Sequence, residues 1–256
     1  MRRESRHSIQ ASPLNGSGGG SIVSEKPLYS QVREQLMVRI GRNEWVGGQR
    51  LPNELDLASE YNVSIATIRK AIQDLQARNL VIRRRGDGTY VTSSEHRDLF
   101  YFWRIVDHRG KREVPTSQIL SCVVSKPTVA EAKRLEVPRT KRVIRIERVR
   151  FLAQRPEILE RIVVPQGLFP DLARRDQVPN ALYRHYEQAY GVNIGRAVED
   201  LSAVSAGERE VKCLKVPRGA ALLQIDRTAF GFDGRPIEWR VSRCSNRRYV
   251  YRNEVT

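Results

Sequence analysis

Residues 51–75 read LPNELDLASEYNVSIATIRKAIQDL, and this stretch decides the fold of the first part of the chain. Asn53 and Ser64 belong to the residue types that cap the N-termini of helices, because their side-chain oxygens accept hydrogen bonds from unpaired backbone amides. Between them, Asn62 tolerates the left-handed backbone that a tight turn after a helix requires. The stretch therefore predicts two short helices joined by a tight turn.

The apolar residues in and before this stretch indicate which helix faces are buried. In the second helix Ile68, Ile72 and Leu75 follow the spacing i, i+4, i+7, so we expect them to face inward. The residues left on the outer face are Ala66, Arg69, Lys70 and Gln73. Upstream, a four-residue apolar spacing predicts another amphipathic helix, which ends at Gly47 and Gly48. Its buried stripe consists of Leu28, Val32, Leu36 and Ile40.

Two short extended segments, residues 81–84 and 89–92, follow the second helix of this pair. The residues between them, Arg85-Gly86-Asp87-Gly88, include two glycines that permit the tight turn of a β-hairpin. Two helices and a turn followed by such a hairpin form a winged helix-turn-helix, which we assign to residues 25–93. Residues 1–24, rich in glycine, serine and charge, are expected to be a flexible tail.

The composition restricts the function further. Lys and Arg number 45 against 29 Asp and Glu, a formal net charge of +16, which indicates a polyanionic partner: nucleic acid ahead of an anionic membrane surface. No apolar run reaches the roughly 20 residues that span a bilayer, so we expect a cytoplasmic protein with no membrane partner. We expect no metal and no cofactor, because neither the histidines nor the three cysteines have metal-ligand spacing. The cysteines are Cys122, Cys213 and Cys244.

The second half of the chain contains an internal repeat. LEVPR at residues 135–139 recurs as LKVPR at residues 214–218, an offset of 79, and the similarity continues into the next strand-like run. Each copy predicts a helix, a Val-Pro turn and two strands joined by a hairpin, and two copies can share one antiparallel sheet. We therefore assign residues 117–256 to one domain of α+β class, joined to the winged helix by a linker at residues 94–116.

Several spaced motifs together resemble the GntR family of winged-helix regulators: LPNE at 51–54, VS at 63–64 with TIR at 67–69, and GDGTYV at 86–91. The second half resembles the UTRA effector-binding domain of the HutC branch, through residues 214–218, DGRP at 233–236, and Glu238. The resemblance implies a chorismate-lyase-like fold, that is, a six-stranded antiparallel sheet with flanking helices. That fold alone implies no catalysis.

The chain departs from the family pattern in both halves. Positions 55 and 65 commonly carry arginines that touch the operator, whereas this chain has Leu55 and Ile65. Near the C-terminus, Cys244 stands where the family often has a tyrosine, and Arg247 where it has an aspartate. The family's operator sequence and its tyrosine contact to the effector are therefore not carried over.

We expect DNA contacts from the helix caps, from the outer face of the second helix of the pair and from the wing. The candidate residues are Asn53, Ser64, Ala66, Thr67, Arg69, Lys70, Arg85, Gly86 and Gly88. The alternative is that the basic residues among them are solvated surface charges, as most exposed lysines and arginines are. Gly86 and Gly88 are favoured for backbone freedom rather than for direct readout of bases.

Arg148 and Arg150 are the candidate effector-binding residues, together with Glu238. Side chains alternate along a strand, so both arginines lie on the face to which Ile144 and Ile146 contribute. Guanidinium groups on an inward face need anionic partners. The partner is either an internal carboxylate, Glu160 or Glu238, or an anionic effector such as a sugar phosphate or a carboxylic acid. The resemblance implies effector contacts from arginines of this strand and from Glu238.

The resulting hypothesis is a transcription regulator, and specifically a repressor, that binds double-stranded operator DNA as a homodimer under control of a small effector. One alternative is a chorismate-lyase-like enzyme with an accessory DNA-binding domain. The sequence shows no nucleophile-base pair, metal spacing or phosphate loop for such an enzyme. Another alternative is an architectural nucleic-acid binder driven by charge alone, which would bind with strong salt dependence but little sequence preference.

Overall fold

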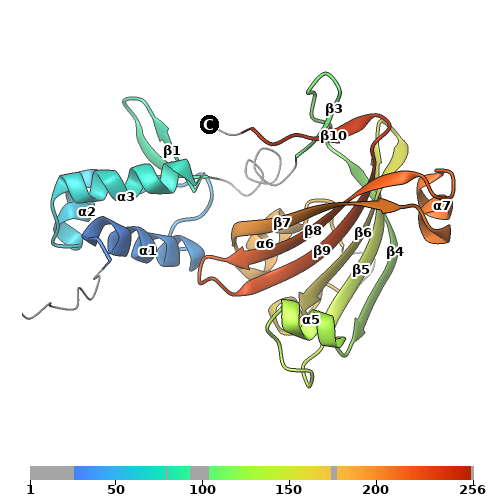
Figure 1. Ribbon diagram of the computed structural model, residues 1–256. Coiled ribbons are helices and arrows are strands. Elements are labelled where there is room, and N and C mark those ends of the chain that lie inside the picture. Colours follow the sequence, from blue (N-terminus) through green and yellow to red (C-terminus); the bar gives the residue numbers. More distant parts are fainter. Residues whose placement is uncertain (1–25, 79, 93–103, 174–177, 255–256) are drawn as a thin grey trace, which may run out of the picture.

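The structure, a computed structural model, describes residues 26–78, 80–92, 104–173 and 178–254. It has two lobes, a small helical domain with a hairpin and a larger sheet domain (Figure 1). The tail expected at residues 1–24 and the aromatic residues 100–103 of the expected linker lie outside the described residues. No helix in the described ranges is long and apolar enough to cross a membrane.

The N-terminal domain is the expected winged helix-turn-helix. Its elements are α1 (Leu28–Gly41), α2 (Glu54–Glu60), α3 (Ile65–Ala77), β1 (Val81–Arg84) and β2 (Gly88–Val91). The Asn53 side chain accepts hydrogen bonds from the backbone amides of Leu55 and Asp56, and the Ser64 side chain accepts one from Thr67. Asn62, with φ of 51°, forms the left-handed turn between α2 and α3. Local capping therefore sets the boundaries of both helices.

The first helix ends earlier than the sequence predicted. We expected Gly47 and Gly48 to terminate it, but α1 stops at Gly41 and the chain turns at Asn43, whose φ is 59°. The physical reason is tertiary: Trp45 folds back into the core of the domain, where its side chain is 8% exposed. The Arg39 guanidinium lies 4.3 Å from the centre of the Trp45 ring and reinforces this turn.

The C-terminal domain is a six-stranded antiparallel sheet in the order β4-β5-β6-β9-β8-β7, which confirms the fold class. Its strands are β4 (Thr116–Ser125), β5 (Val143–Leu152), β6 (Arg155–Pro165), β7 (Ile194–Ser205), β8 (Ala221–Gly231) and β9 (Pro236–Ser245). Its helices are α5 (Val129–Arg134), α6 (Leu182–Tyr190), α7 (Glu208–Leu214) and the short 3-10 helix η2 (Gln166–Leu168). In the core, α6 packs on one face of the sheet.

The internal repeat explains the strand order. One copy contributes β4, β5 and β6, the other β7, β8 and β9, and the copies meet where β6 pairs with β9. The likeness extends to irregular features at the same 79-residue offset. Glu136 and Lys215 both take positive φ after a short helix, and a β-bulge follows both Arg150 and Ala229. The two halves are therefore copies in backbone detail as well as in sequence.

The expected linker contains a strand that the sequence did not indicate. Within residues 94–116, β3 (Ile105–Asp107) pairs antiparallel with β10 (Tyr249–Tyr251) at the end of the described chain. This two-stranded ribbon packs against the sheet through Ile105 and Tyr249. A three-residue strand paired with a partner far along the chain has no local periodicity by which it could be recognised.

Candidate functional site

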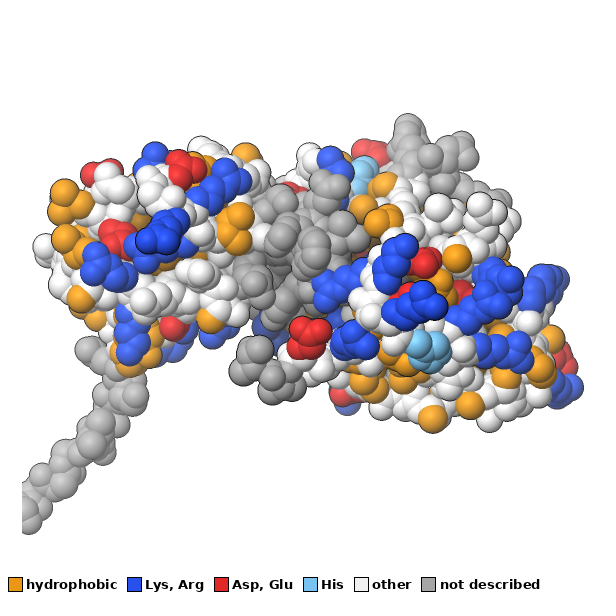
Figure 2. Space-filling model, turned by 90° about the horizontal axis from the view of Figure 1, so that it is seen from above, with side chains coloured by type: hydrophobic (Ala, Val, Ile, Leu, Met, Phe, Trp, Pro, Cys, Tyr) orange, Lys and Arg blue, Asp and Glu red, His pale blue; other side chains and the backbone are white. Residues whose placement is uncertain are grey.

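The face formed by α3 and the wing is the candidate DNA-binding surface. On it Ser64, Ala66, Arg69 and Lys70 are exposed and Thr67 is half-buried, while the inward residues of α3 are fully buried as predicted. Figure 2 looks down on this side of the molecule, where Lys and Arg side chains lie among hydrophobic and uncharged ones on the winged-helix domain. Positive charge and an exposed helix N-terminus are what a DNA backbone attracts.

Glu54 orients Arg69, a role that sequence reasoning missed. Its carboxylate accepts hydrogen bonds from Arg69 Nε and from Arg83 Nη2, both at 2.9 Å. The Glu54 side chain is 17% exposed, whereas those of the two arginines are half exposed. It thus ties α3 to β1 of the wing. The sequence analysis named Glu54 only as part of the LPNE motif, because its partners lie far along the chain.

Lys70 and Asn53 have internal roles in this structure. Lys70 Nζ lies 4.4 Å from the centre of the Tyr29 ring of α1, so the side chain turns to α1 while Arg69 turns to α2. Asn53 uses its side-chain oxygen as the double acceptor of the α2 cap. The structure therefore groups Arg69 with Arg83 and does not add Lys70 to that pair.

The wing glycines are explained by backbone geometry. Gly86 has φ of 76° and Gly88 φ of 136°, both in the region that side chains disfavour. A Cβ atom at Gly88 would also lie 2.6 Å from Nε of Arg50, so a larger residue would displace that guanidinium. Arg85 is exposed at the turn, where it can reach a phosphate.

On one face of the large sheet, β5 and β6 bring together Arg148, Arg150 and Glu160. Arg148 Nε donates to Glu160 Oε2 at 2.6 Å, and Arg150 Nη1 lies 3.8 Å from the same oxygen. Arg148 is fully buried and Glu160 is 2% exposed. Arg148 Nη1 also donates to the backbone oxygen of Asn180. Within the described residues, Arg148 Nη2 is buried without a hydrogen-bond partner.

Glu238 of β9 is the centre of an adjoining network that includes residues the sequence analysis did not name. Its two oxygens accept hydrogen bonds from the hydroxyls of Tyr183 and Tyr186 on α6, and from Nε and Nη2 of Arg240. These four bonds fill the ordinary capacity of a carboxylate, so an effector reaches Glu238 only by displacing one of them. Strand alternation from Glu238 would have pointed to Arg240, but no local signal points to the tyrosines.

The two networks are joined electrostatically. Arg240 Nη1 lies 3.6 Å from Glu160, so this one carboxylate faces three guanidinium groups. Burial alone would raise the pKa of Glu160, but Arg148, Arg240 and Arg150 outweigh that effect and hold this pKa far below its usual range. Burial and the charge of Glu238 raise the pKa of Tyr183 and Tyr186, so both hydroxyls stay protonated and donate. Among the described residues, three guanidinium groups therefore lie around the single carboxylate of Glu160.

A small cavity of about 20 Å³ adjoins this cluster. Glu160, Arg227, Arg240 and Ser242 line it from the sheet, and Ile105 and Tyr251 of the β3–β10 ribbon close it. Arg227, the repeat counterpart of Arg148, is held by Glu199 of β7. A cavity of this size has room for about one water molecule and is too small for a sugar-sized ligand.

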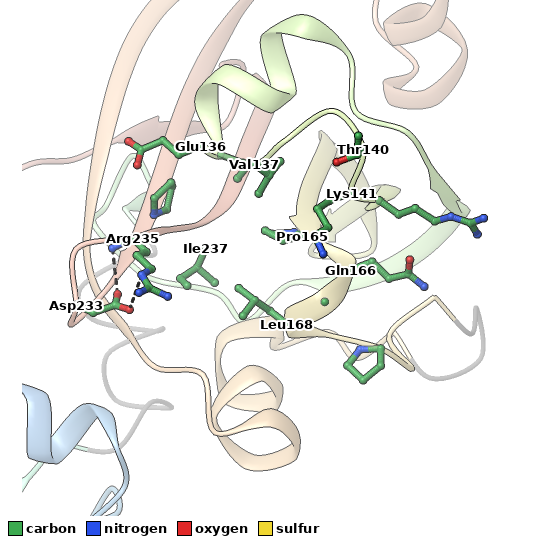
Figure 3. A pocket seen from close by; sticks show the side chains of 15 residues that line it. Glu136, Val137, Thr140, Lys141, Pro165, Gln166, Leu168, Asp233, Arg235 and Ile237 are labelled. Atoms are coloured by element: carbon green, nitrogen blue, oxygen red, sulfur yellow. Dashed lines mark hydrogen bonds and ion pairs between the residues drawn. The ribbon is translucent and has the colours of Figure 1, made fainter.

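A larger groove, of about 800 Å³, lies elsewhere on the sheet domain, between the turn after α5, η2 and the β8–β9 hairpin (Figure 3). Its floor includes Val137, Pro165, Leu168 and Ile237, and its rim carries an exposed ion pair of Asp233 with Arg235. None of the candidate effector residues lines it. The groove is therefore separate from the buried charged cluster.

Comparison with known proteins identifies the family. Residues 28–91 match the family model for bacterial regulatory proteins of the gntR family, and residues 110–250 match that for the UTRA domain. The chain belongs to the GntR family of bacterial regulatory proteins and carries a UTRA domain. It is therefore a transcription regulator, and the enzyme alternative is not supported.

Individual relatives agree with this assignment. The mannosyl-D-glycerate transport/metabolism system repressor MngR of Escherichia coli is 28% identical over 85% of this chain and 91% of its own. A ligand-binding domain from Bordetella bronchiseptica, assigned to a GntR-family regulator, matches with TM-score 0.56 and 28% identity over 61% of this chain and 99% of that one. PhnF of Mycobacterium smegmatis matches 88% of this chain and 99% of its own at TM-score 0.52 and 20% identity, which shows the fold alone.

Proposed function

We propose that this protein is a cytoplasmic repressor that binds a two-part operator as a homodimer and responds to a small anionic effector. One recognition helix reads only a short half-site, and paired half-sites match a two-fold dimer. The exposed residues of α3 with the basic wing support the DNA contact. The MngR relative is named as a repressor, which supports the direction of control.

The observation that carries the effector proposal is the fully buried Arg148, which is paired with Glu160 but has no hydrogen-bond partner for its Nη2 within the described residues. Arg148, Arg150 and Arg240 share this single carboxylate, and Arg240 is also paired with Glu238. Burying a guanidinium without a full counter-charge is costly, so an added phosphate or carboxylate is favourable here. The planar fork of arginine suits both groups, and Arg148 Nη2 offers a donor.

Effector entry requires the site to open. The cavity of about 20 Å³ is far smaller than a sugar phosphate or sugar acid, and Ile105 and Tyr251 of the β3–β10 ribbon line it. A ligand that binds only the open arrangement shifts the protein toward that arrangement, which is how binding can alter the DNA-binding lobe. D-glycerate carries a carboxylate, so the name of the MngR relative fits this chemistry.

The test begins with a thermal-shift screen of sugar phosphates and sugar acids, followed by calorimetric titration of the compound that stabilises the protein. Arg148→Ala and Arg150→Ala should abolish its binding, while operator affinity without effector stays nearly unchanged. The matched control is Arg161→Ala, because Arg161 is exposed on β6 and lies one position along from Glu160. Retention of effector affinity in both arginine variants would place the effector site elsewhere.

A further inference from the structure

Two large apolar side chains are exposed on the candidate DNA-binding face. Leu55, in the first turn of α2, is 65% exposed, and Ile65, the first residue of α3, is 39% exposed. Both line a shallow pocket of about 360 Å³ whose other walls include Arg69, Arg83 and Gly88. Single exposed apolar residues are common and need no explanation, but two in one pocket at the N-terminus of a recognition helix form a local surface.

The surroundings of this surface indicate what covers it. Arg50, Arg69 and Arg83 line the same pocket together with Glu54, so cations outnumber the one carboxylate around the apolar pair. A polyanion with apolar groups between its charges is the complement of that arrangement. In duplex DNA the phosphates follow the edges of the major groove, and the C5-methyl of thymine is the apolar group on its floor.

We propose that Leu55 and Ile65 read thymine methyl groups in the major groove of the operator, an inference that rests on the operator binding proposed above. Ile65 is the first residue of the recognition helix, α3, whose first residues reach base edges, and Leu55 of α2 lines the same pocket beside it. Neither side chain can donate or accept a hydrogen bond, so a guanine or cytosine edge at the same position loses its water without gaining a partner. The apolar pair therefore selects A·T pairs at its positions, and Arg69, oriented by Glu54, supplies adjacent hydrogen bonds.

The experiment uses the full-length protein and an operator obtained by selection from random-sequence duplexes. Each thymine of the selected site is replaced singly by deoxyuridine, which removes the methyl group and changes no hydrogen-bonding atom of the base. Affinity is measured by fluorescence anisotropy at fixed salt. At the positions read by the pair, loss of the methyl should weaken wild-type binding about fourfold, the factor expected for burying one such group.

Each responsive thymine is then assigned to a residue by repeating the deoxyuridine measurements with protein variants. In Leu55→Ala the deoxyuridine effect should disappear at one position, and in Ile65→Ala at another, because each variant removes the partner of that methyl. Val46→Ala is the control: Val46 is 51% exposed in the same domain but does not line the pocket, so every deoxyuridine effect should remain.

The outcomes separate this inference from the proposed function. Sequence-specific binding in which no thymine responds to deoxyuridine, or in which the responses persist in both variants, would overturn methyl reading while operator binding stands. Failure of the selection to enrich any sequence would overturn operator binding and methyl reading together.

Discussion

Asn193 Nδ2 donates a hydrogen bond of 2.9 Å to Asn43 Oδ1, and this contact joins the sheet domain to the winged-helix domain. Asn43 also lies 3.4 Å, through its Nδ2, from the backbone oxygen of Gly191. Nearby, Phe232 at the tip of the β8–β9 hairpin packs on the core of the winged helix, where the hairpin meets the end of α1 (Figure 1). These contacts come from segments next to α6, whose tyrosines bond Glu238, and next to β9, which carries Glu238.

The first prediction is that Asn43→Gly weakens communication between the effector and the operator. Glycine keeps the positive φ of this position and removes only the side chain that bonds Asn193. The ratio of operator affinities with and without effector, typically five- to 150-fold in coupled systems, should move toward one while effector affinity is retained. It is measured by anisotropy titration. The control is Asn62→Gly, which has a similar φ; an unchanged ratio in Asn43→Gly would exclude this contact from the coupling.

The second prediction concerns the recognition helix. Arg69→Ala should weaken specific operator binding by about 1–3 kcal/mol without unfolding the domain, because its exposed side chain lies outside the core. Lys70→Ala should cost less, since Lys70 lies against Tyr29. Mobility shifts at fixed salt, with circular dichroism as the folding check, measure both. Equal losses in the two variants would mean that Arg69 acts only as surface charge.

The third prediction is that Glu160→Gln destabilises the sheet domain by about 3 kcal/mol or more. The substitution leaves Arg148, Arg150 and Arg240 without the carboxylate that they share, and breaking a buried charge pair costs on this scale. Urea denaturation followed by fluorescence measures the free energy of unfolding. The exposed Glu136→Gln should change it by no more than about 0.5 kcal/mol. A similarly small loss in Glu160→Gln would refute charge sharing.

The fourth prediction follows from the depressed pKa of Glu160. A carboxyl whose folded-state pKa lies below its unfolded value of about 4.3 contributes stability that is fully present above that pH. The contribution is lost as the pH falls from about 4.3 through the lower folded value. Wild-type unfolding free energy should therefore decline more steeply with acid than that of Glu160→Gln. Parallel pH profiles for the two proteins would contradict this assignment.

Local chemistry and the repeat predicted much of the fold. The caps at Asn53 and Ser64 and the turn at Asn62 depend on neighbouring residues alone, so they could be read from sequence. The antiparallel sheet followed from two similar halves. The end of α1 could not be predicted, because it depends on Trp45 packing into the core of the folded domain. The β3–β10 ribbon could not be predicted either, because its two strands lie far apart in the chain.

The candidate sites also contain some residues that could be predicted from local patterns and others that could not. Strand alternation placed Arg148 and Arg150 on one buried face and named Glu160 as a potential partner, and the structure pairs them. Glu54 and the two tyrosines around Glu238 were missed because each meets its partner only after the domain has folded. The tertiary fold brings these groups together, and it cannot be read from local sequence patterns.

The packing of the Phe232 side chain has a consequence for engineering hybrid regulators. The side chain lies against two glycines: a Cβ at Gly41 would come within 3.1 Å of it, and one at Gly195 within 2.9 Å. A winged helix transplanted from a relative with a bulky residue at the position of Gly41 would clash with Phe232 in the β8–β9 hairpin of this sheet domain. Whether the two domains can be exchanged between relatives therefore depends on one small residue at the end of α1, which belongs to neither of the proposed binding sites.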